Sequence, residues 1–234
     1  MAAIVPAMHA KLQRKKIMTD TRRGLMLDAA RSALSELGLG GANIREIAKR
    51  AGYTPGAIYA YFDSKEAILG ALLAESLDRL AAAMGQARTV KGQPARTLQA
   101  KAMAWFGFYM GNPKEMDWLQ YLLRDERDLV AADPQWADLK DRLQQALAPW
   151  EAALTALGLS SADAQREKAA LFAQGVGLLM LHRSARLEVL PLPADALFKR
   201  CLEQLIARCA PLLNLAETDQ GAALPPQVDL FDAT

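Results

Sequence analysis

The stretch from Asn43 to Phe62 constrains the fold of this chain more than any other segment. Asn43 is a typical N-cap, and apolar residues follow it at helical spacing. Gly52 supplies the left-handed residue that commonly ends a helix. Thr54 and Pro55 then provide a cap and a first-turn proline for a second helix. Two short helices joined by such a tight turn predict a helix-turn-helix.

The rest of the chain shows helical apolar spacing and no alternating strand pattern. Further helices are expected over 21–37, Lys65 to about Gly85, Pro94–Met110, from Pro113, Pro134–Leu157, Ser160 to about Arg186, and Ala194 to about Leu213. We therefore predict an all-α fold, with a three-helix helix-turn-helix headpiece at residues 21–66 and a larger helical domain at 67–215. Residues 1–20 are expected to form a mobile basic arm, and residues 216–234 a weakly ordered tail.

Charge is distributed unevenly along the chain. Residues 1–66 contain eleven Lys and Arg against six Asp and Glu, whereas the remainder contains seventeen against twenty. The basic excess lies with the helix-turn-helix, which favours a nucleic-acid partner. The cluster from Lys11 to Lys16 has two explanations. It belongs either to a solvated tail or upstream extension before a true start at Met18, or to an arm that contacts phosphate or the minor groove.

Several classes of protein are disfavoured by what the sequence lacks. No apolar run is long enough to span a bilayer and no secretion signal is evident, so we expect a cytoplasmic protein without a membrane partner. Cys201 and Cys209 are too far apart along one helix to pair, and we interpret them as reduced core thiols. Neither a metal-binding constellation nor a cofactor motif is present, and no catalytic nucleophile arrangement is visible. We therefore expect no enzyme and no cofactor.

The region from Arg22 to Leu69, about a fifth of the chain, resembles the DNA-binding domain of the TetR family of transcriptional regulators. The matching residues are Ala29 and Ala30, Ile47 and Ala48, Ala51 and Gly52, Gly56, Ile58 and Tyr59, Tyr61 and Phe62, and Ser64, Lys65 and Glu66. The resemblance implies a homodimer whose second domain binds a ligand and whose two C-terminal helices form the interface. It also implies a sequence-specific DNA-binding regulator, most simply a repressor that a small apolar or aromatic ligand releases from its operator.

The resemblance places the DNA contacts on the two short helices and just beyond them. The expected contact residues are Asn43, Arg45, Thr54, Pro55, Gly56, Ala57, Tyr59, Tyr61 and Lys65. Pro55 and Ala57 cannot form the bidentate hydrogen bonds that read purines, so specificity is expected to depend on Thr54, Arg45, thymine methyl groups and DNA shape. Tyr53 departs from the aliphatic residue that is commoner in the family.

Aromatic and methionine side chains are concentrated in the second domain, where they either fill a core or line a ligand pocket. The candidate ligand-binding residues are Met103, Trp105, Phe106, Tyr109, Trp118, Tyr121, Leu122 and Trp136. The candidate dimer contacts are Ala173, Gly177, Leu181, Leu197, Cys201 and Leu205. Two alternative functions are considered: a DNA-binding dimer that is insensitive to ligands, and an all-helical enzyme that uses the aromatic pocket.

Overall fold

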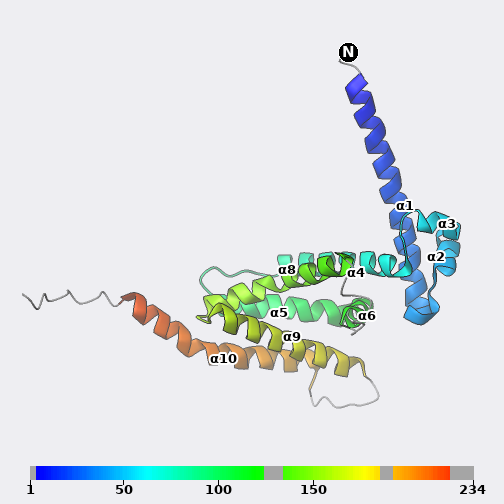
Figure 1. Ribbon diagram of the computed structural model, residues 1–234. Coiled ribbons are helices and arrows are strands. Elements are labelled where there is room, and N and C mark those ends of the chain that lie inside the picture. Colours follow the sequence, from blue (N-terminus) through cyan, green and yellow to red (C-terminus); the bar gives the residue numbers. More distant parts are fainter. Residues whose placement is uncertain (1–3, 124–133, 185–191, 222–234) are drawn as a thin grey trace, which may run out of the picture. The chain divides into compact units, whose positions relative to one another are not determined.

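The computed structural model describes residues 4–123, 134–184 and 192–221, and every regular element within these ranges is an α-helix (Figure 1). The helices are α1 (Ile4–Gly41), α2 (Ile44–Ala51), α3 (Pro55–Tyr59), α4 (Lys65–Gln86), α5 (Pro94–Gly111), α6 (Pro113–Leu122), α8 (Pro134–Ala156), α9 (Ser161–Arg183) and α10 (Ala194–Gly221). The all-α prediction is confirmed. Most predicted helices start or end within a few residues of their observed bounds.

The first and last helices are longer than the sequence predicted. Helix α1 begins at Ile4 instead of residue 21, and residues 12–20 of this extension are all exposed. Gly38, with φ 68°, interrupts the regular geometry of α1 near its end. Helix α10 continues to Gly221, past the expected start of the tail, and residues 222–234 lie outside the described ranges. Mobility of the arm and a role for it in DNA binding stay predictions.

The chain forms two compact units that alternate along the sequence. Unit 1 comprises residues 1–79 and 114–143, and unit 2 comprises residues 80–113 and 144–234. Helices α4 and α8 therefore contribute residues to both units. The sequence-based division instead places one boundary between residues 66 and 67, and these domain limits stay a prediction.

In unit 1, α2 packs against both α1 and α3. Fully buried apolar side chains from these helices and α4 form the core, among them Met26, Ile47, Ile58 and Ile68. Ion pairs connect the helices at the edge of this core. Arg50 of α2 contacts Glu36 of α1 at 2.9 Å and Glu46 of its own helix at 2.8 Å. These contacts hold α2 against α1. The position of the helix-turn-helix depends on this packing.

In unit 2, α5 packs against α9 and α10, which also contact each other (Figure 1). Between these helices and α8 lies a set of rings that we call the aromatic cluster: Trp105, Phe106, Tyr109, Trp150, Phe172 and Phe198. The ring centroids of Phe106 and Phe198 are 4.4 Å apart in a stacked arrangement. Gly175 of α9 permits this packing, since a Cβ there would lie 2.5 Å from the Trp105 ring.

Candidate nucleic-acid interface and ligand sites

The helix-turn-helix forms through local hydrogen bonds that the sequence predicted. The Asn43 side chain accepts a hydrogen bond from the backbone N–H of Glu46 at 3.0 Å, which caps α2. Gly52, with φ 72°, ends α2 in the left-handed conformation. Thr54 caps α3 by accepting from the N–H of Ala57 at 3.2 Å, and Pro55 occupies the first turn. Both predicted caps and the predicted turn residue are therefore confirmed.

The start of α3 is open to solvent. Thr54, Pro55 and Gly56 are exposed, and the Tyr59 side chain is 54% exposed although it is large and aromatic. A Cβ at Gly56 would meet only the Thr54 hydroxyl oxygen, at 4.0 Å, so nothing in the described part of the protein requires a glycine at this position. The turn can therefore lie close to a flat or grooved partner surface.

The other predicted DNA contacts differ in accessibility. Arg45 is exposed and forms no hydrogen bond or ion pair with another described residue, so its guanidinium is available to a phosphate. Ala57, Tyr61 and Lys65 are half-buried. Asn43 is exposed, but its side-chain oxygen serves the cap described above, which leaves only its amide hydrogens for a partner.

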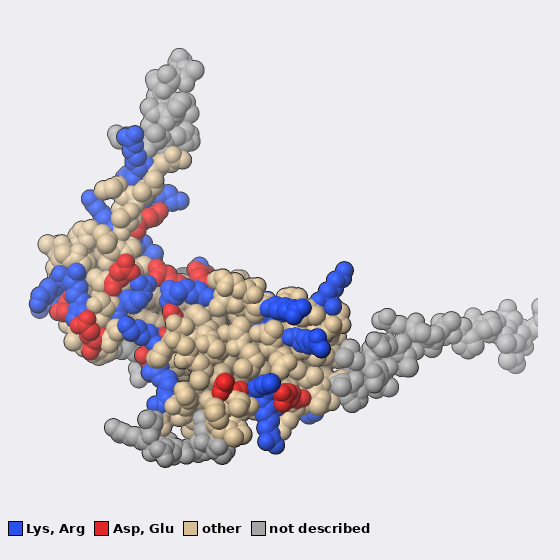
Figure 2. Space-filling view, turned by 180° about the vertical axis from the view of Figure 1, so that it is seen from behind, with Lys and Arg blue, Asp and Glu red and all other residues tan. Residues whose placement is uncertain are grey.

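Two arginines of α1 contact aromatic residues of the helix-turn-helix, and sequence reasoning missed both. A hydrogen bond with Tyr61 raises the pKa of Arg22. Arg23 lies over the Phe62 ring, 5.0 Å from its centroid, in a cation–π contact. Spacing along the sequence gives no indication of these pairs, because they join positions about forty residues apart. On the face drawn in Figure 2, basic and acidic side chains are interspersed over this part of unit 1.

The described fold defines an all-helical protein with an N-terminal helix-turn-helix. Residues 26–72 match the family model described as bacterial regulatory proteins, tetR family. Over this segment, which is about a fifth of its length, the chain is similar to the TetR family of regulators.

The similarity to relatives and to solved structures extends beyond this segment. The chain is 30% identical over 131 residues to the transcriptional repressor KstR2 of Mycobacterium tuberculosis, covering 56% of this chain and 64% of that protein. It is 33% identical over 122 residues to the transcriptional activator FasR of Mycolicibacterium smegmatis, covering 52% and 53%. The matches thus span between half and two thirds of these relatives. A transcriptional regulator from Rhodococcus sp. RHA1 has the same fold, with a TM-score of 0.64 and 22% identity over 80% of this chain and 96% of that one.

The eight candidate ligand-binding residues are divided between the two units. Trp105 and Phe106 have no exposed surface and Tyr109 is 3% exposed, while Met103 is half-buried beside them on α5. In the described structure these rings fill the core of unit 2. The indole N–H groups of Trp105 and Trp150 are nevertheless buried without a hydrogen-bond acceptor among the described residues. The ring centroids of these two residues are 5.4 Å apart, so the two rings that carry the unpaired donors are neighbours in the aromatic cluster.

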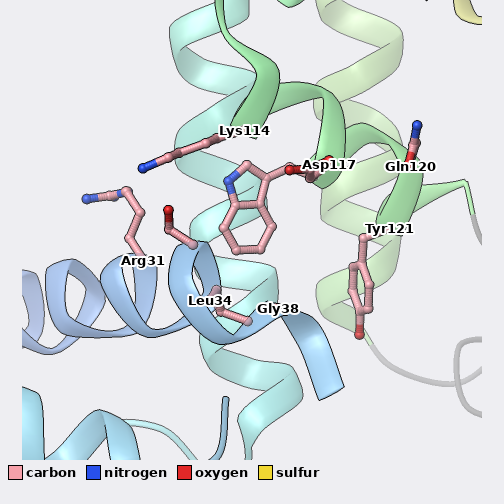
Figure 3. Close-up of a pocket in the computed structure, with 9 residues that line it drawn as sticks. Arg31, Leu34, Gly38, Lys114, Asp117, Gln120 and Tyr121 are labelled. Atoms are coloured by element: carbon pink, nitrogen blue, oxygen red, sulfur yellow. The ribbon is translucent and has the colours of Figure 1, made fainter. Parts of the chain in front are cut away.

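The other four candidates belong to unit 1, and two of them line a cavity of about 200 Å³ between α1 and α6 (Figure 3). We call this cavity the α1–α6 pocket. Its lining residues are Arg31, Leu34, Ser35, Gly38, Lys114, Asp117, Trp118, Gln120 and Tyr121. Trp136 lies beside Tyr121, with ring centroids 6.0 Å apart, and Leu122 is half-buried, but neither lines this pocket. The contribution of α1 to a pocket was not foreseen from the sequence.

The candidate dimer residues lie on α9 and α10. Ala173 and Leu181 are exposed. Gly177, Leu197 and Cys201 are half-buried, and so can still offer some surface to a second copy. Leu205 is only 4% exposed because it packs into unit 2, which makes it a poor candidate for a contact between copies. The dimer interface stays a prediction.

Within the described ranges, none of the helices is long and apolar enough to cross a membrane. The same residues contain no group of three side chains positioned to hold a metal ion.

Proposed function

We propose that this protein is a sequence-specific DNA-binding transcriptional regulator, acting as a dimeric repressor. The observation that carries the proposal is the exposed, capped N-terminal turn of α3, at which Gly56 is not required by the protein's own packing. In a helix-turn-helix, this end of the second helix enters the major groove. A repressor and an activator both occur among the relatives. We propose repression, because a repressor requires only that the protein occupy its operator and that a ligand release it.

In the proposed complex, small residues bring the backbone of α3 close to the DNA. Thr54 keeps its hydroxyl hydrogen for a phosphate or base while its oxygen caps the helix. Arg45 and Tyr59 supply exposed donors to phosphates, and Arg22 adds a positive charge next to Tyr61. Because few side chains here can read base edges, DNA shape and the spacing of two half-sites in a dimer carry much of the specificity.

Selection of bound fragments from a random DNA pool tests this proposal directly. The expected result is enrichment of one palindromic site, as a two-fold dimer requires. Arg45→Ala separates the two roles considered for that residue. A uniform loss of affinity on all sequences would make Arg45 a phosphate contact, whereas a changed preference at one position would make it a base contact. A pool that shows no enrichment and no retention would contradict DNA binding and favour the alternative enzyme function.

We further propose that a small apolar or aromatic ligand releases the protein from DNA after binding at the aromatic cluster. The unpaired indole N–H groups support this, because a buried donor without an acceptor costs about 1–3 kcal/mol, which a ligand oxygen reaching it would recover. The rings must move apart to admit such a ligand. Ligand binding then favours a headpiece arrangement that no longer matches successive major grooves.

Mobility-shift titrations with candidate compounds test the release. A compound that binds at the aromatic cluster is expected to weaken operator affinity, and by linkage the operator must weaken binding of that compound by the same factor. Tight binding that leaves operator affinity unchanged would refute release for that compound. If no compound affected the shift, the ligand-insensitive DNA-binding dimer would be the better description.

A further inference from the structure

The α1–α6 pocket has no part in the proposed ligand site, because all its lining residues belong to unit 1 and the aromatic cluster belongs to unit 2. We propose that this pocket is a second binding site, for a flat aromatic carboxylate. The ring lies against Trp118, and the carboxylate meets the ammonium group of Lys114.

The apolar part of the pocket fits one or two fused rings. Trp118 is 7% exposed and Leu34 is 9% exposed, so both are fixed by packing and form a rigid wall. Tyr121, from the next turn of α6, adds a second ring to the same pocket. A cavity of about 150 Å³ holds benzene in another protein, whereas drug-sized molecules need roughly 300 Å³ or more. The volume of about 200 Å³ therefore selects a small ligand.

The charges around the pocket favour an anionic group on that ligand. Arg31 is held by Asp28 and Glu75, each at 2.5 Å, so two carboxylates already offset its charge. Lys114 is exposed and forms no hydrogen bond or ion pair with any other residue in the described part of the chain. Its electrostatic neighbour Glu36 is paired with Arg50 at 2.9 Å. The ammonium of Lys114 is therefore the cation available to a ligand carboxylate, with which it would form a charge-assisted hydrogen bond.

The opposite side of the pocket limits the ligand to one negative charge. Figure 3 shows Lys114 and Arg31 on one side of the pocket and Asp117 on the other. A second carboxylate at the far end of the ring would approach Asp117 and be repelled. The geometry thus distinguishes an aromatic monocarboxylate from a dicarboxylate of similar size.

The pocket connects α6 to the helix that supports the helix-turn-helix. Helix α1 provides four of its lining residues and also packs against α2. A ligand between α1 and α6 therefore contacts the element that orients α2 and α3. An effect of this ligand on DNA affinity rests on the proposed function, but binding at the pocket does not.

Isothermal titration of the full-length protein with 2-naphthoate tests the site. Binding is expected to weaken about five- to tenfold when 2-naphthamide, its neutral counterpart, replaces it, and by a similar factor in Lys114→Ala. Naphthalene-2,6-dicarboxylate is expected to bind more weakly than 2-naphthoate. Lys140→Ala removes another exposed helical lysine of unit 1 that does not line the pocket, and should leave the affinity unchanged.

Two further measurements locate the ligand without disturbing the core. Ser35→Phe, at an exposed lining position, fills the cavity and should abolish binding while circular dichroism stays unchanged. In NMR spectra of the indole N–H groups, 2-naphthoate should shift the Trp118 signal, assigned with Trp118→Phe, more than the signals of Trp105 and Trp150. Equal affinity for the acid and the amide, unchanged binding in Lys114→Ala or Ser35→Phe, or no binding at millimolar 2-naphthoate would overturn the proposal. If 2-naphthoate binds as expected but the protein binds no DNA from the random pool, the second site is supported. Only the proposed DNA-binding function is then refuted.

Discussion

At the scale of single residues, a substitution at Gly56 should affect DNA affinity without affecting the stability of the fold. Its Cβ position is open, so Gly56→Ala should leave the thermal midpoint of unfolding unchanged or slightly raised. The added methyl group would nevertheless occupy the space between α3 and DNA. We expect operator affinity to fall at least about tenfold, or ~1.4 kcal/mol, in fluorescence anisotropy titrations. Gly107→Ala is the matched control, as an exposed helical glycine of unit 2 that also has open space around it. Equal affinity of Gly56→Ala and wild type would show that α3 does not approach DNA through this residue.

Gly175 presents the opposite case, in which the protein itself requires a glycine. A Cβ there would lie 2.5 Å from one Trp105 ring atom and 3.1 Å from a Phe198 ring atom. Gly175→Ala should therefore destabilise the fold by about 1–3 kcal/mol, measured by urea unfolding, because the rings cannot shift without disturbing the cluster. The same substitution at Gly107 of α5, an exposed helical glycine with no neighbouring atom within 4 Å, is expected to cost little. Similar losses in both variants would mean that helix geometry and not ring packing sets the cost.

At the scale of elements, the buried Lys101 of α5 holds the end of α4. Its ammonium group donates to the carbonyl oxygens of Met84 and Ala87, each at 2.7 Å, and lies 3.5 Å from that of Gly85. These carbonyls are at the C-terminus of a helix, where a cation is favoured and orphan acceptors need partners. Lys101 is 6% exposed, so water replaces these bonds poorly.

Lys101→Met should destabilise the protein by about 1–3 kcal/mol, since it retains the packing volume but leaves the carbonyls unpaired. Urea unfolding followed by circular dichroism measures this change. Lys91→Met, an exposed lysine in the adjacent α4–α5 connection, should change the free energy of unfolding by no more than about 0.5 kcal/mol. If both variants had equal effects, the carbonyl contacts would contribute nothing specific.

The elements were largely predictable because their ends are set by local chemistry. Asn43, Gly52, Thr54 and Pro55 act through hydrogen bonds and backbone angles within four residues of themselves, and all behave as the sequence predicted. The extension of α1 to Ile4 was missed, because its residues 12–20 are exposed and show no apolar period from which a helix could be predicted. The α1–α6 pocket was missed for another reason. It joins residues some eighty positions apart, whose meeting depends on the packing of whole helices.

At the scale of the whole molecule, the proposed dimer can be tested on α9. Leu181 is 38% exposed and its neighbour Met180 is 50% exposed, which is a considerable apolar surface at the end of one helix. Leu181→Glu should convert the expected dimer to a monomer at micromolar concentration, because a charge buried at an interface is costly to desolvate. Light scattering with size-exclusion chromatography gives the mass. Leu37→Glu, at a 45% exposed leucine of unit 1, should leave the dimer intact. A monomeric wild-type protein would refute the dimer itself.

The unpaired indole N–H groups of Trp105 and Trp150 have an optical consequence. An indole in dry surroundings without a hydrogen-bond acceptor emits at shorter wavelength than one that water or a polar group can stabilise in its excited state. With Trp118 and Trp136 replaced by Phe, the remaining fluorescence should therefore be blue-shifted and shielded from iodide quenching. A ligand oxygen that reached the two N–H groups would move this emission to the red. The intrinsic fluorescence of Trp105 and Trp150 would thus report whether the rings of the aromatic cluster have moved apart.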